Sequence, residues 1–66
     1  MRFTDFVGLV NAFGFELSRT HGSHHIFTHP DIPEILNLQN SKGHVKPYQI
    51  RQFLQLVEQY NLTLEE

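Results

Sequence analysis

The chain has 66 residues, with five Lys or Arg, seven Asp or Glu, five His and no Cys, and its formal net charge is −2. A chain of this length forms one domain, here residues 1–66, and so small a domain buries only about 60% of the surface of its unfolded chain. These numbers exclude large catalytic clefts, dinucleotide-binding folds and barrels. The absence of cysteine excludes disulfides, thiolate metal sites and a cysteine nucleophile.

No segment of the sequence has the pattern of a signal peptide or of a membrane span. The first residues do not combine a charged start with an apolar stretch, and no apolar run approaches the roughly 20 residues that a span requires. We therefore expect a protein of the cytoplasm that does not bind a membrane.

The first element predicted is a short amphipathic helix over residues 4–13. Thr4 suits its N-cap, and Asp5 lies in the first turn, where the helix dipole favours negative charge. Gly14 follows at the position where a left-handed residue commonly ends a helix. The apolar side chains recur at the helical spacing that places them on one face: Phe6, Leu9, Val10 and Phe13.

Three short strands are expected next. Alternating or β-rich segments predict them at residues 15–19, 24–29 and 34–39. The first two form a hairpin with its turn in residues 20–23, where Gly22 can adopt a positive φ. A loop follows at residues 40–43.

The last element predicted is a helix from Pro47 to about Tyr60, which Asn61 can end. Pro47 suits the first helical position, because its missing N–H would have no partner there. The apolar stripe of this helix comprises Ile50, Phe53, Leu54 and Val57, and Leu56 and Tyr60 widen it. The order of the elements indicates an α+β fold, in which two helices pack on one face of a three-stranded antiparallel sheet and leave the other face in water.

Four of the five histidines fall between positions 21 and 29, and strand alternation separates them. One face of the second strand carries His24, Ile26 and Thr28, and the other carries His25, Phe27 and His29. Because Phe27 is the larger apolar anchor, we assign its face to the core and the His24 face to solvent. Ile26 could play the same part in the opposite arrangement.

A histidine cluster first suggests a metal site, but the spacing opposes one. Zinc needs three or four ligands about 2.0–2.1 Å away. His25 and His29 lie roughly 13 Å apart along a strand that rises about 3.3 Å per residue, and His24 and His25 point to opposite faces. Only His21 and a neighbour across the turn could converge. We expect no metal and no cofactor.

Proton transfer is the second chemistry that histidine supports, since an imidazole has an ordinary pKa of about 6.5. Cleavage of RNA needs a base for the 2′-hydroxyl proton and an acid for the leaving 5′-oxygen, and a positioned histidine contributes roughly 10²–10⁴-fold in either role. Gly22 and Ser23 could bring N–H groups and a hydroxyl to a phosphate. On the spacing of the histidines alone, the favoured alternative is a polar hairpin whose histidines have no catalytic role.

Two segments resemble a known family. Residues 14–19 read G-F-E-L-S-R and residues 22–30 read G-S-H-H-I-F-T-H-P, and both are similar to the HicA family of toxin–antitoxin toxins. The resemblance covers essentially the whole chain and implies a fold like that of a double-stranded-RNA-binding domain, with the element order α-β-β-β-α.

The resemblance also implies a function. It indicates a metal-independent endoribonuclease that cleaves mRNA and is inhibited by a HicB-like antitoxin protein. It points to His24 as the catalytic histidine, with Gly22 and Ser23 shaping the turn, and to His25 as the second choice. The alternatives are a non-catalytic RNA-binding module, a domain that binds only its antitoxin, and a metal-dependent nuclease.

The chain departs from the family pattern after the third strand. Many members continue with a V-P-x-H segment and a basic loop, whereas this chain reads L-N-L-Q at residues 36–39 and continues with G-H-V-K-P-Y at residues 43–48. The departure leaves open how RNA is held and whether His44 supplies the acid.

Few basic residues are available to hold RNA. The expected contacts are phosphate contacts from Arg19 and Lys46 and base stacking on Tyr48, although ordinary surface charge and helix packing also explain Lys46 and Tyr48. Residues 17–52 contain four Lys or Arg and two acids, so a locally positive face is possible within a negative chain. We expect RNA binding to be weak and to fall steeply with salt.

Overall fold

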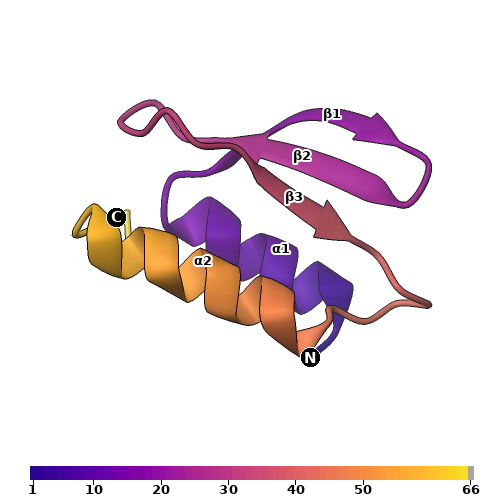
Figure 1. Cartoon of the computed structure of the whole chain (residues 1–66). Coiled ribbons are helices and arrows are strands. Elements are labelled where there is room, and N and C mark those ends of the chain that lie inside the picture. The colour runs from indigo at the N-terminus through magenta and orange to yellow at the C-terminus, as the bar shows by residue number, and fades with distance from the viewer. Residues whose placement is uncertain (66) are drawn as a thin grey trace.

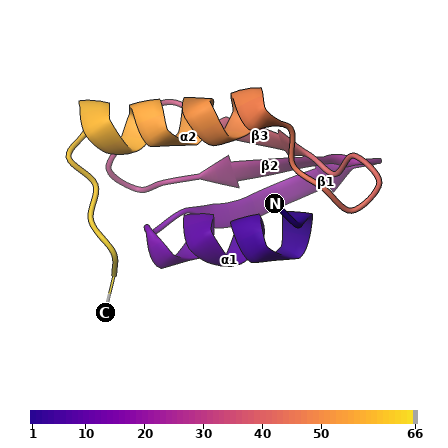
Figure 2. The ribbon, with the colours of Figure 1, turned by 90° about the horizontal axis from the view of Figure 1, so that it is seen from below.

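The computed structural model describes residues 1–65 and confirms the predicted order of elements. The elements are α1 (Phe3–Ala12), β1 (Glu16–His21), β2 (His24–Thr28), β3 (Leu36–Gln39) and α2 (Pro47–Gln59). The strands form one antiparallel sheet in the order β1-β2-β3. Both helices lie on the same side of this sheet (Figure 1), and in Figure 2, seen from below, α2 and α1 run along its two sides with the strands visible between them. The α+β architecture predicted from the sequence is therefore confirmed.

The start of α1 differs from the prediction. Arg2 rather than Thr4 is the N-cap, and no side chain caps the helix. The Phe3 N–H instead donates to the Gly43 carbonyl at 2.9 Å, and Arg2 pairs with His44 in an isolated β-bridge. A backbone partner 40 residues away in the sequence therefore replaces the local cap, and the helix begins one residue before Thr4.

Both helices end as predicted. Gly14 and Asn61 have positive φ values of 95° and 53°, in the left-handed region that ends helices. After α1, the Phe15 N–H donates to the Val10 carbonyl at 3.1 Å, which is the long hydrogen bond of a Schellman motif, and the equivalent bond closes α2. These ends fix where the chain leaves each helix.

The hairpin is tighter than predicted. β1 extends through Thr20 and His21, so only Gly22 and Ser23 form the turn. Gly22 has a φ of 57°, and a positive φ at the first central position is typical of the type II′ turn that suits twisted hairpins. The consequence is that His21 and His24 are paired directly across the hairpin.

The core lies between the sheet and the helix pair. Its most deeply buried side chains are Phe6, Val10, Phe15, Phe27, Leu36, Leu38 and Phe53. The Phe53 ring packs edge-on against the rings of three other phenylalanines at centroid distances of 5.4–5.8 Å, an arrangement that the charge distribution of aromatic rings favours. Phe27 faces this core and His24 is exposed, as predicted.

The burial of three side chains differs from what the hydrophobic pattern of the sequence predicts. Leu54, expected in the apolar stripe, is 52% exposed. Gln49 is buried because it faces the sheet, where its Nε2 donates to the Asn37 carbonyl at 3.3 Å. Ile26 is buried although it lies on the open face, because it sits on the central strand between Arg19 and Asn37.

Candidate functional site

The face of the sheet opposite the helices (Figure 1) is not covered by a helix. The strand register and the burial of each residue place a cluster of polar side chains on this face. The register places them together, because directly paired residues of antiparallel strands point to the same face. His24 is paired with His21 on one side and with Gln39 on the other, and the next pairs along this face join Ile26 to Arg19 and Asn37. We call Arg19, His21, His24, Asn37 and Gln39 the open-face cluster.

His24 is exposed, and one hydrogen bond orients its ring. Its Nδ1 lies 3.2 Å from Oδ1 of Asn37 on the neighbouring strand. An amide oxygen can only accept, so Nδ1 donates the hydrogen and Nε2 of the neutral ring keeps its lone pair. In the neutral ring, Nε2 of His24 is therefore the nitrogen that can accept a proton, and the side chain lies on the exposed face of the sheet.

His25 lies on the other face of the same strand. Its ring is half-buried against Phe3, with ring centroids 4.7 Å apart, and its Nδ1 donates to the Ser23 carbonyl at 3.1 Å. With Phe3, Val7 and Leu17 it lines an apolar groove between α1 and the sheet edge. The structure therefore separates His25 from the open-face cluster.

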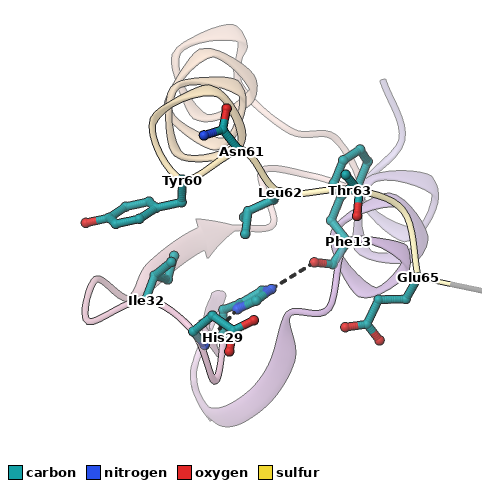
Figure 3. A pocket seen from close by; sticks show the side chains of 9 residues that line it. Phe13, His29, Ile32, Tyr60, Asn61, Leu62, Thr63 and Glu65 are labelled. Carbon is teal, nitrogen blue, oxygen red and sulfur yellow. Dashed lines mark hydrogen bonds between the residues drawn. The ribbon is translucent and has the colours of Figure 1, made fainter.

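His29 is a buried histidine with both ring nitrogens in use. Its Nε2 donates to the Phe13 carbonyl at 3.0 Å, and its Nδ1 accepts from the Asp31 N–H at 3.1 Å (Figure 3). The ring also packs edge-on against Phe15, with centroids 5.1 Å apart. These contacts join the loop after β2 to the end of α1, which is a structural role.

A cavity of about 220 Å³ lies beside His29. Figure 3 shows His29 and Ile32 on one side of it and Tyr60 and the following chain on the other. The Glu65 N–H donates to the Ala12 carbonyl at 2.7 Å, which holds this segment against α1. The cavity lies at the helix layer and is not part of the open-face cluster.

The expected RNA-contacting residues fall into two groups. Arg19 belongs to the open-face cluster, and Gly22 and Ser23 form the exposed turn directly before His24. Lys46 is the N-cap of α2 and Tyr48 is 51% exposed in its first turn, so both lie in the helix layer. The exposure of Tyr48 contradicts the interpretation of this ring as a packing residue.

His44, left open as a source of the acid, lies in the loop before α2. Its backbone is paired with Arg2, at the start of α1, and with Ser41 in the same loop, and not with the strand that carries His24. Within residues 1–65, no group of three or more His, Asp or Glu side chains could hold a metal ion.

Asn37 is a site residue that no sequence motif marks. Strand alternation could have predicted its orientation, because Leu36 and Leu38 face the core and Asn37 between them must then face outward. Its partner was not predictable, because the register between β2 and β3 depends on the irregular loop that joins them. The sequence places His21 in the turn, whereas the structure places it at the end of β1, paired with His24.

Comparison with known proteins identifies the family. Residues 3–59 match the model of the family described as "HicA toxin of bacterial toxin-antitoxin". No curated protein and no solved structure matches the chain. In the part of the chain that the structure describes, no helix is both long and apolar enough to cross a membrane. Since the match runs from the first residue of α1 to the last residue of α2, the chain belongs to the HicA toxin family of bacterial toxin–antitoxin systems.

Proposed function

We propose that this toxin is a metal-independent endoribonuclease that cleaves mRNA, with His24 as a group that transfers a proton in the cleavage step. The observation that carries the proposal is the exposed His24 ring, held at Nδ1 by Asn37 with Nε2 free on the open face. Because mRNA is the substrate, the proposed site of action is the cytoplasm.

The proposed chemistry suits a small protein because RNA contains its own nucleophile. The 2′-oxygen attacks the neighbouring phosphorus and loses its proton to a base, while the 5′-oxygen leaves with a proton from an acid. The products are a 2′,3′-cyclic phosphate and a 5′-hydroxyl. Proton transfer by positioned imidazoles supplies catalysis of this kind, worth roughly 10²–10⁴-fold for each group.

The RNA strand is proposed to lie over the hairpin end of the open face. Arg19 supplies a positive charge to a phosphate on the same face as His24. The Gly22–Ser23 turn brings backbone N–H groups close to the reacting phosphate. Lys46 and Tyr48, in the helix layer, are proposed to contact a more distant part of the strand, through charge and through base stacking.

The proposed inhibitor is a HicB-like antitoxin protein. Membership of a toxin–antitoxin family supports a protein partner. To inhibit the proposed activity, the antitoxin must prevent RNA from reaching His24. Covering the hairpin end of the open face is sufficient for this. The second candidate, a non-catalytic module that binds RNA or only its antitoxin, uses the same surface without the proton transfer.

Incubation of RNA with the purified, folded chain in excess EDTA tests this proposal. The expected result is cleavage that leaves 2′,3′-cyclic phosphate and 5′-hydroxyl ends, detected by mass spectrometry of the fragments. Intact RNA with reduced gel mobility would support the non-catalytic module. Cleavage that EDTA abolishes and added metal restores would indicate a metal-dependent nuclease and would contradict the proposal.

A further inference from the structure

We propose that His21 is the second catalytic residue, acting as the general acid opposite His24 as the general base. The inference rests on the proposed ribonuclease function and completes it, because cleavage needs a proton donor as well as a proton acceptor. The observation behind it is the direct pairing of His21 with His24 across the hairpin.

The geometry places both imidazoles over one site. Directly paired side chains of an antiparallel hairpin have Cβ atoms about 4.5–5.5 Å apart on the same face. Both residues are exposed, and the two-residue turn between them fixes the register. Two imidazoles at this spacing can contact two different oxygen atoms of one phosphodiester.

The other histidines are placed elsewhere. His25 faces the helix layer, His29 is buried with both ring nitrogens bonded, and the backbone of His44 is paired at the start of α1. His21 is thus the histidine that shares both a face and a register position with His24.

Asn37 distinguishes the two roles. Its Oδ1 accepts the Nδ1 hydrogen of His24, which leaves Nε2 as the proton acceptor. The same hydrogen bond persists after Nε2 takes up a proton, and a hydrogen bond to a charged ring is stronger than one to a neutral ring. Asn37 is therefore a positioning residue that favours His24 as the base, and the acid role falls to His21.

The proton balance of the step is complete without another reactant. His24 Nε2 takes the proton from the 2′-hydroxyl as the bond between the 2′-oxygen and phosphorus forms. The bond between phosphorus and the 5′-oxygen breaks, and protonated His21 gives its proton to that oxygen. Exchange with water then returns both rings to their starting protonation.

Few other charged groups lie near His21 and His24 to affect the pH dependence of the cleavage rate. On the open face β1 also contributes Arg19 beside His21 and Glu16 at the far end, whereas β3 contributes only the amides of Asn37 and Gln39. The loop after β3 borders the turn and carries exposed Lys42. A reaction that needs one neutral and one protonated imidazole has a bell-shaped dependence of kcat/KM on pH.

Substitution combined with a modified substrate tests the assignment. One substrate is a mapped RNA cleavage site, and the other has sulfur in place of the 5′-oxygen at that site, a leaving group that needs no acid. We expect His21→Gln to slow cleavage of the normal RNA about 10²-fold and to remove the fall in rate at alkaline pH. On the sulfur substrate His21→Gln should be close to wild type, whereas His24→Ala should be slow on both.

The matched control is His44→Gln, the same change at another exposed histidine, which should leave both substrates and the pH profile unchanged. Equal slowing of both substrates by His21→Gln, or an alkaline limb lost in His44→Gln instead, would overturn the acid role of His21. If His24→Ala abolishes cleavage while His21→Gln matches wild type, this inference fails and the proposed function stands. Wild-type protein that does not cut RNA would overturn both.

Discussion

At the residue scale, the surroundings of each ring nitrogen determine what a histidine can do. His29 is a core residue because both of its nitrogens have backbone partners. His24 differs in having one nitrogen held and the other free at the surface. Two residues of the same type in one short segment thus differ in their surroundings, because His24 lies on the open face of β2 whereas His29 follows β2 and is buried against the end of α1.

Asn37 provides a prediction at this scale. Replacing it with Leu removes the acceptor for His24 Nδ1, and a hydrogen bond worth about 1.4 kcal/mol corresponds to a tenfold loss in kcat/KM for RNA cleavage. Asn37→Asp keeps an oxygen acceptor and should restore most of the rate. Steady-state kinetics of the two variants across pH measure the effect, and equal activity of Asn37→Leu and wild type would remove the positioning role.

The faces of His24 and His25 were predictable from the sequence, whereas their hydrogen-bond and pairing partners were not. Alternation around Phe27 is enough to place His24 outward and His25 inward, because a strand has a period of two. The His24–Asn37 contact joins β2 to β3 and depends on their register, which the intervening irregular loop leaves undetermined in the sequence. His21 was misplaced for a related reason, since the turn was expected to be longer than it is.

At the element scale, the ends of the helices show which signals are local. Gly14 and Asn61 mark helix ends through their own backbone preferences, and both were predicted correctly. The start of α1 was predicted wrongly, because the partner of the Phe3 N–H is the carbonyl of Gly43, far away in the sequence. A helix end that depends on the backbone preference of its own residue can be predicted from the sequence, whereas a cap contributed by a distant segment cannot.

Gly14 gives a prediction with a built-in control. Its φ of 95° is strained for other residues, and an added Cβ would lie 2.5 Å from Glu65 Oε1 and 2.8 Å from His29 Nε2. Gly14→Ala should lower the free energy of unfolding by about 1–3 kcal/mol. Gly8→Ala, in the middle of α1 where no atom lies within 4 Å, should raise it by about 0.8–1.0 kcal/mol. Urea unfolding measures both, and equal effects of the two changes would refute this explanation.

Tyr60 connects the end of α2 to the loop between β2 and β3. Its hydroxyl donates to the Glu34 carboxylate, and this hydrogen bond, followed by desolvation and the negative charge, raises the pKa of Tyr60 above its ordinary value of 10.0. The pKa is higher in the folded state, so the stabilisation is fully present below about pH 10 and is lost as pH rises through the folded value. Wild type should therefore exceed Tyr60→Phe in unfolding free energy at pH 8, and the difference should shrink at higher pH. A difference that stays constant through pH 11 would contradict the assignment.

At the scale of the whole molecule, the two-layer fold separates stability from the proposed activity. Two helices on one face of the sheet bury the phenylalanine core, and the opposite face stays open (Figure 1). In the proposed mechanism, histidines on a short hairpin transfer the protons, so the small size of the chain is no obstacle to that catalysis. The net charge of −2 leaves few cations to hold RNA.

Salt dependence follows from that charge. Each phosphate contact on a single strand adds about 0.7 to the magnitude of the slope of log K against log salt. Arg19→Gln should therefore lower the slope for RNA binding by about 0.7, without changing the unfolding free energy appreciably. Titration of labelled RNA between low and moderate salt measures this, and an unchanged slope would exclude Arg19 as a phosphate contact.

The most direct test of the central claim compares two neighbouring histidines. His24→Ala should lower the single-turnover rate of RNA cleavage at least about 10²-fold while the fold is retained. His25→Ala should stay within a few-fold of wild type and lose stability instead, because its ring packs on Phe3. The opposite result, with cleavage abolished by His25→Ala and retained by His24→Ala, would contradict the assignment of the open face as the active surface.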